Sequence, residues 1–245
     1  LIWPIGLGLL LQMAKNNLEL GKKKIGTSPE LILIPCIILV ASGPIISSAR
    51  GGAFVMVGLL ILTTLSIPLL RIKSKFVFVA FIGCIFLAMF AGYHFGWEKL
   101  EPRLMNIFTD NLSNRKQIYE ATHRMIDQYV LSNTPPNPFG SGPGSFEAVA
   151  QFELNETLTR WETWAHNDYL EIMLTFGLPG VIVILIIITL QLLILFSNSI
   201  YSKQKRFCYF GAISLLGVSI HAAGDFPFQV YSICSLILFL LASIT

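Results

Sequence analysis

Residues 172–196 read IMLTFGLPGVIVILIIITLQLLILF, a run without a single charged side chain. A helix needs about 20 apolar residues to cross the roughly 30 Å hydrocarbon core of a bilayer, so this run is long enough to span a membrane. The whole chain of 245 residues agrees with this interpretation, because 54% of it is hydrophobic and only 13% is charged. Soluble domains carry about 25% charged residues, so the composition predicts a membrane protein.

Similar apolar runs recur along the chain and predict further spans. Leu1–Ala14 has neither the basic start nor the cleavage site of a signal peptide, and we expect it to be the tail of another span in a longer protein. The complete predicted spans are Leu31–Ala49, Gly52–Leu70, Phe76–Phe95, Ile172–Phe196, Phe207–Ala223 and Phe228–Ile244. The sequence therefore predicts an all-α fold, a polytopic bundle of transmembrane helices with a large outward-facing helical loop.

The distribution of charge predicts the orientation of these spans. Lys15–Glu30, Arg71–Lys75 and Lys203–Arg206 contain ten of the seventeen basic residues but only two of the fourteen acidic ones. Basic loops stay in the cytoplasm, so these three segments are expected inside. The organisation that follows is a first group of spans over residues 1–95, a large outer loop over 96–171, and three spans over 172–245.

The outer loop is too long to be a passive connector, since structureless loops beyond about 12–15 residues are usually functional or disordered. Ser113 or Asn114 is expected to cap a helix that runs to about Leu131, with one apolar side that lies on the membrane domain or at the lipid interface. The run Pro135–Gly144 predicts turns, and a second helix is expected over Phe146–Leu158. We therefore predict a folded loop.

Two arginines on the outward side occupy positions that are unfavourable for a cation without a partner. Arg50 lies between two predicted spans, where positive charge is disfavoured and an ionisable group is functional by default. Arg115 is expected at a helix N-terminus, where a cation costs roughly 0.3–1 kcal/mol. A bound anion would explain both positions, and the alternatives are a snorkelling Arg50 and a solvated Arg115.

His166 lies in the segment WAHNDYLE, residues 164–171, where the outer loop re-enters the membrane. A neutral imidazole can take up a proton near pH 7, and a neighbouring carboxylate such as Asp168 or Glu171 can orient it. The alternative is an interfacial histidine bonded to backbone. His221, at the outward end of a later span, is a weaker candidate for the same cavity.

The acidic residues form no motif for a metal. Asp110, Asp127, Asp168 and Asp225 are isolated in the sequence, whereas a hard divalent cation prefers clustered oxygens. The run Gly140–Gly144 lacks the Lys-Ser/Thr of a phosphate-binding loop, and no basic patch indicates nucleic acid. We expect no cofactor, no metal and no nucleic-acid partner.

Three segments together resemble one known family. Ser48-Ala49-Arg50-Gly51-Gly52 resembles the Ser-Arg-Gly segment of the O-antigen ligase family. Asn114-Arg115 with Ile118-Tyr119, followed by Gly140–Phe146, is similar to the large outer loop of that family. His166-Asn167-Asp168-Tyr169-Leu170, with Phe176-Gly177 and Gly180, resembles its His-Asn motif and the span that follows. Their order, spacing and shared outward face make the combination specific.

The resemblance implies a glycosyltransferase of the bacterial inner membrane whose active site faces the periplasm. It implies that a glycan moves from a polyprenyl-pyrophosphate carrier, held in membrane lipid, to a hydroxyl of an acceptor such as lipid A-core. Arg50 and Arg115 are then expected to pair with the pyrophosphate, and His166 to act as general base. Asn167 and Asp168 are expected to contact substrate. We expect direct displacement with inversion and without metal or nucleotide, because pyrophosphate is already a good leaving group.

Other functions remain open at this stage. A polysaccharide polymerase or a protein O-glycosylating transferase would share the fold and chemistry and differ in the acceptor. A lipid or glycan transporter needs polar groups near mid-membrane and broken helices in matching halves. Pro44 and Pro179 can break spans but do not lie in matching halves, and the charges lie at span ends, so transport ranks below transfer. An inactive scaffold is the remaining alternative.

Overall fold

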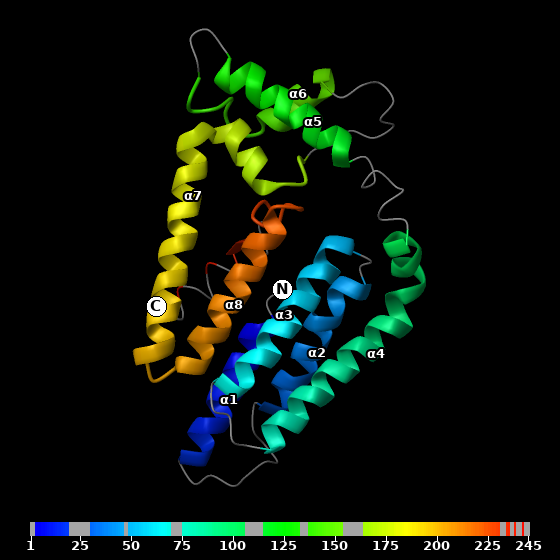
Figure 1. Ribbon diagram of the computed structural model, residues 1–245, viewed down its shortest axis with the longest axis vertical. Coiled ribbons are helices and arrows are strands. Elements are labelled where there is room, and N and C mark those ends of the chain that lie inside the picture. Colours follow the sequence, from blue (N-terminus) through cyan, green and yellow to red (C-terminus); the bar gives the residue numbers. More distant parts are fainter. Residues whose placement is uncertain are drawn as a thin grey trace. The chain divides into compact units, whose positions relative to one another are not determined.

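All regular structure in the described part of the chain is helical, as the sequence predicted (Figure 1). The computed structural model describes residues 3–19, 30–46, 49–69, 75–105, 115–132, 137–153 and 164–230, with residues 234, 235, 238 and 242. The chain divides into two compact units. The first unit contains Leu1–Met105, Gln191–Val218 and Leu238–Thr245, and the second contains Asn106–Leu190 and Ser219–Ile237.

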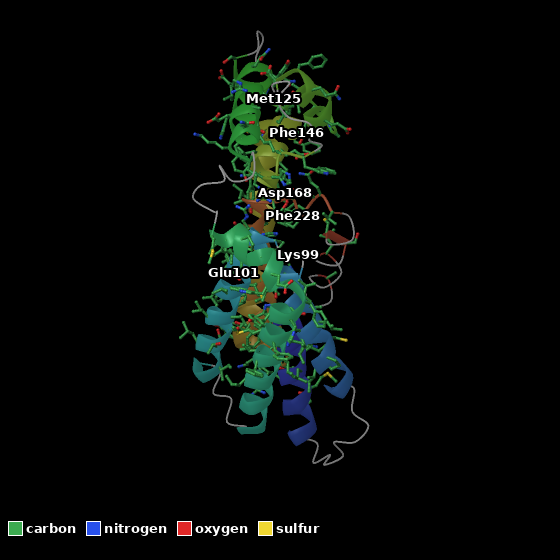
Figure 2. The ribbon with its side chains drawn as sticks, turned by 90° about the vertical axis from the view of Figure 1, so that its right-hand side faces the viewer. Lys99, Glu101, Met125, Phe146, Asp168 and Phe228 are labelled. Atoms are coloured by element: carbon green, nitrogen blue, oxygen red, sulfur yellow. The ribbon has the colours of Figure 1, made fainter. Side chains whose placement is uncertain are left out.

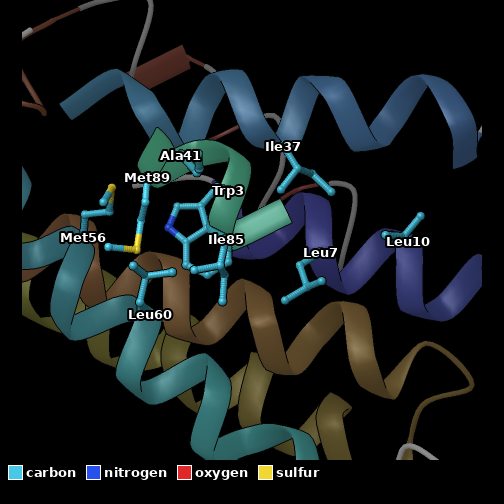
Figure 3. A pocket seen from close by; sticks show the side chains of 10 residues that line it. Trp3, Leu7, Leu10, Ile37, Ala41, Met56, Leu60, Ile85 and Met89 are labelled. Carbon is cyan, nitrogen blue, oxygen red and sulfur yellow. The ribbon is translucent and has the colours of Figure 1, made fainter. Parts of the chain in front are cut away.

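The first unit is built from long apolar helices. They are α1 (Trp3–Glu19), α2 (Glu30–Ile46), α3 (Arg50–Leu69), α4 (Lys75–Met105) and most of α8 (Lys205–Ala222). Side chains from α1 to α4 surround the indole of Trp3, among them Leu7, Ile37, Leu60 and Met89 (Figure 3). Burial of such side chains is worth about 1.5–3 kcal/mol each in water, and in lipid the close packing itself stabilises the helices.

These helices coincide with the predicted spans, but α4 is longer than expected. The span was predicted to end at Phe95, whereas α4 continues to Met105 and so enters the segment assigned to the outer loop. The apolar run ends there, but the following Glu98, Lys99 and Leu100 are good helix formers, so the helix does not end with it. The predicted span Phe228–Ile244 lies largely outside the described residues, as do Ser47, Ser48, Ser113 and Asn114.

Two helices of the described part are long and apolar enough to cross a membrane. They are Arg50–Ile67 in α3 and the 34-residue α7, Asp168–Tyr201. The exposed side chains of α7 include Ile186, Ile187 and Leu190. Only 11% of the most apolar 18-residue stretch of this helix is buried within the protein. A water-exposed apolar surface of this extent is unfavourable, so lipid or further protein is expected to cover it.

The second unit contains shorter helices around the start of α7. They are α5 (Arg115–Ile126), its π-helical continuation η2 (Asp127–Leu131) and α6 (Ser145–Glu153). The predicted apolar side of α5 is confirmed, since Ile118 and Met125 are buried. These side chains pack within the unit on Phe146 of α6 and Leu174 of α7 (Figure 2). Leu174 lies in the predicted span Ile172–Phe196, in line with the expected contact with the membrane domain. The spacing of the apolar residues along α5 predicts a buried face, but not which element covers that face.

A break divides α7 near its start. Gly177 has φ 65° and ψ −164°, so the helix is interrupted there, two residues before Pro179. Proline lacks the amide hydrogen that a helix interior requires, which is why Pro179 was named as a residue that can break a span. At Pro44, the other such residue, α2 continues as helix.

Candidate functional site

His166 lies in a backbone conformation that is uncommon for a residue with a side chain. Its φ is 53°, in the left-handed region, and no other non-glycine residue of the described part has a positive φ. The phenol of Tyr119, on α5, donates a hydrogen bond of 3.0 Å to the carbonyl oxygen of His166. Such strained conformations persist only where neighbours hold them, and they are concentrated at functional sites.

The residues after His166 begin α7 and fix the direction of the chain. The side-chain oxygen of Asn167 accepts hydrogen bonds from the amides of Tyr169 (3.0 Å) and Leu170 (3.1 Å), which caps the helix. The carboxylate of Glu171 accepts a 2.9 Å hydrogen bond from the amide of Ala165. The turn that carries His166 is therefore held from both sides.

Three basic side chains meet at one carboxylate, that of Asp225 in the turn after α8. The Nδ1 atom of His166 and the Nε2 atom of His221 each lie 3.6 Å from an oxygen of Asp225. The guanidinium of Arg115 lies 3.9 Å from Asp225 and also donates a hydrogen bond to the carbonyl oxygen of Gly224. These four side chains, called the Asp225 cluster below, come from α5, the turn before α7, the end of α8 and the turn after α8. The arrangement pairs a potential base with a cation beside a fixed negative charge.

The cluster keeps Asp225 ionised. Burial opposes ionisation of this carboxyl, but the neighbouring His166, Arg115 and His221 outweigh it and lower the pKa of Asp225 below its usual value. Burial raises the pKa of Tyr119, although the nearby charge of Arg115 opposes this. Tyr119 is therefore a neutral donor to His166, and Asp225 is a permanent anion at neutral pH.

The side chain of Asp168 makes its hydrogen bonds within the protein. Its side chain is fully buried, and its two oxygens accept hydrogen bonds from the amide of Phe228 (2.8 Å) and the side-chain amide of Gln229 (2.9 Å). Asp168 and Phe228 lie close together in Figure 2. These contacts favour a role for Asp168 in holding the Asp225 turn against α7 over direct contact with substrate.

Aromatic rings cover one side of His166. The ring of Phe226 lies 5.1 Å from the imidazole and stacks on Trp164 with centroids 5.5 Å apart and an interplanar angle of 15°. His166 itself is partly accessible, with 24% of its side chain exposed. The rings limit the imidazole's freedom and lower the local polarity, while leaving an accessible edge.

The predicted site residues divide between the two units. Arg115, His166, Asn167 and Asp168 all belong to the second unit, where the first two meet at Asp225. Arg50 is the first residue of α3, in the first unit, and is partly exposed. Its expected contact with the pyrophosphate remains a prediction.

Two residues have larger roles than the sequence indicated. Asp225 was treated as an isolated acid, yet its carboxylate occupies the position beside Nδ1 of His166 that was expected for Asp168 or Glu171. Tyr119 had no assigned role. The available signal was the position of Asp225 four residues after His221, just beyond the outward end of the predicted span Phe207–Ala223. His221, the weaker candidate for the same cavity, lies 3.6 Å from the carboxylate of Asp225.

The sequence matches the O-antigen ligase family over residues 35–185. The match covers more than half of the chain, so this protein belongs to the O-antigen ligase family, a family of bacterial membrane glycosyltransferases of the ligase or polymerase type. Arg50, Arg115 and His166 fall within the matched residues, whereas His221 and Asp225 lie beyond them. No curated protein and no solved structure matches the chain at a significant level.

Proposed function

We propose that this protein is an O-antigen ligase that transfers a glycan from a polyprenyl-pyrophosphate carrier to an acceptor hydroxyl such as that of lipid A-core. It acts in the bacterial inner membrane, as a polytopic bundle with its site facing the periplasm. The observation that carries the proposal is the Asp225 cluster, in which the imidazole of His166 and the guanidinium of Arg115 share one carboxylate. Family membership supplies the reaction class, and the cluster supplies groups suited to it.

His166 is the general base in this mechanism. The Asp225 carboxylate beside Nδ1 favours the tautomer with its proton on that nitrogen, which makes Nε2 the basic atom. Nε2 takes the proton of the acceptor hydroxyl as its oxygen forms a bond to the anomeric carbon. The bond from that carbon to the phosphate oxygen breaks at the same time, and its electron pair leaves with the pyrophosphate. A single displacement of this kind inverts the anomeric centre.

Arg115 stabilises the charge that develops on the leaving group. A guanidinium has five N–H donors, so its contacts with Gly224 and Asp225 leave donors for phosphate oxygens. A third of the Arg115 side chain is exposed. Arg50 is proposed as a second partner of the pyrophosphate, because two arginines match the charge of that group better than one.

Ligation and its dependence on His166 can be tested with the full-length protein in membranes that contain polyprenyl-pyrophosphate glycan and lipid A-core. His166→Ala is expected to reduce transfer by about 10²–10⁴-fold, the usual contribution of a general base. His123→Ala is the matched control, because His123 is an exposed histidine of α5 outside the cluster, and it should retain wild-type transfer. Asp225→Asn, which keeps the shape but removes the charge, should show a smaller loss than His166→Ala.

The products separate the remaining alternatives. Joining of glycan to lipid A-core by the wild type supports ligation, whereas lengthening of the carrier-linked glycan would identify a polymerase. Full transfer by the His166→Ala variant would exclude His166 as the base. The absence of both products with a folded wild type would contradict glycan transfer and favour a transporter.

A further inference from the structure

The break in α7 leaves two carbonyl groups without their helical partners, and a distant loop supplies new ones. In a regular helix the carbonyl of Thr175 would accept from residue 179, but Pro179 has no amide hydrogen. The amide of Gly142 instead donates to Thr175 over 2.9 Å, and the amide of Ser141 donates to Leu174 over 2.8 Å. The loop therefore completes the hydrogen bonding of the broken helix.

The two backbones approach so closely that only glycine fits on either side. A Cβ atom on Gly140 would lie 2.6 Å from the amide nitrogen of Gly177, and a Cβ atom on Gly177 would overlap the carbonyl group of Pro138. Both glycines also have positive φ values, 79° at Gly140 and 65° at Gly177. We call this contact between the Pro138–Gly142 loop and the α7 break the glycine interlock.

The interlock connects the elements that carry the catalytic groups. On one side, the amide of Asn137 donates to the carbonyl of Val130 at the end of η2, which continues α5 and leads back to Arg115. On the other side, the short helical segment from Asp168 to Gly177 leads back to His166. The distance between Arg115 and His166 thus depends on how α5 lies against the start of α7. The interlock is a further connection between them, besides the apolar core and the hydrogen bond from Tyr119 to His166.

We propose that Gly140 and Gly177 are positioning residues whose interlock sets the placement of Arg115 relative to His166 and Asp225. The catalytic part of this inference rests on the proposed glycan transfer, whereas its structural part does not. A misplacement of about 1 Å can cost a reaction about 10²-fold, so a displaced α5 is expected to slow transfer without removing any catalytic group.

Hydrogen–deuterium exchange of the full-length protein tests the structural part. Peptides that contain Ser141 and Gly142 should be protected in the wild type, and in Gly177→Ala they should exchange at least about tenfold faster together with the first turns of α5. Gly144→Ala is the matched control, since Gly144 has a positive φ of 75° but open space around its Cβ position. It should leave both regions protected. Fast exchange of Ser141 and Gly142 in the wild type, or a change in Gly177→Ala confined to the loop, would overturn the proposal.

A double-mutant cycle tests the catalytic part. Gly177→Ala is expected to reduce transfer at least about tenfold, and Gly144→Ala less than about threefold. In an Arg115→Ala background the Gly177→Ala change should cause little further loss, because the residue that it misplaces is absent. Losses that multiply would show that the interlock acts on overall stability and not through Arg115.

A milder variant is needed if Gly177→Ala does not fold. Pro179→Ala restores an amide that competes for the carbonyl of Thr175, so faster exchange at Gly142 is expected, and unchanged exchange would contradict the interlock. If the wild type transfers no glycan, the proposed function fails, while the exchange experiments still decide whether the interlock holds α5 in place.

Discussion

At the scale of single residues, Asp225 decides how the site is organised. One carboxylate contacts His166, His221 and Arg115, so a change at Asp225 disturbs all three partners at once. A buried charge whose partner is removed is costly, because water no longer compensates it. We therefore expect the cluster to contribute to stability as well as to chemistry.

The lowered pKa of Asp225 predicts a dependence of stability on acid. A carboxyl whose pKa is lower in the folded state stabilises the fold above its unfolded pKa of about 3.9, and this contribution is lost as the pH falls through the folded value. The apparent melting temperature of the wild type should therefore fall more steeply below about pH 4 than that of Asp225→Asn. Thermal unfolding in detergent between pH 3 and 6 measures this difference. Asp127→Asn, on an exposed carboxyl outside the cluster, is the control and should keep the wild-type slope.

At the scale of elements, the start of α7 is the part on which the site depends most. The Asp168 contacts and the hydrogen bond from the phenol of Tyr169 to the carbonyl of Ser219 (2.8 Å) hold the end of α8 and the turn after it against this helix. The side-chain amide of Asn167 adds a 2.9 Å hydrogen bond to the carbonyl of Ala223. Asn167, which the sequence predicted to contact substrate, thus makes its hydrogen bonds within the protein.

Substitutions at Asn167 separate the contribution of the helix cap from that of the hydrogen bond to Ala223. Asn167→Ala removes both and should lower the free energy of unfolding by about 1–2 kcal/mol. Asn167→Asp keeps the capping oxygen but loses the donor to Ala223, so it should cost less. Two measurements distinguish the variants: the free energy of unfolding in detergent, and hydrogen exchange at the amides of Tyr169 and Leu170, which bond to the capping oxygen. Equal losses in both would mean that the cap contributes nothing.

At the scale of the whole molecule, the distribution of charge predicts which surfaces face the cytoplasm. The exposed Gln204 lies in the basic connection between α7 and α8, whereas the exposed Gln151 lies on α6 in the predicted outer loop. Cysteine substitutions at these two sites, in a chain without its native cysteines, report the topology. An impermeant maleimide should label Gln151→Cys in cells with a permeabilised outer membrane, and label Gln204→Cys only after lysis. The reverse pattern would contradict the proposed orientation.

The helices and their apolar character could be predicted from the sequence because they depend on local composition and spacing. The same holds for Arg115 and His166 as candidates, since each stands out against its immediate neighbours. The end of α4 was missed, because a change from apolar to charged side chains does not end a helix made of good helix formers.

Only the tertiary structure decided which groups meet. Arg115 and its acceptor Gly224 are 109 residues apart in the chain, and no local pattern records their contact. Asp225 became the shared carboxylate, and Asp168 a buried anchor, because electrostatic and hydrogen-bonding partners depend on distance in space. The glycine interlock has the same origin, since Pro179 predicts a break in α7 but not the loop whose amides complete it.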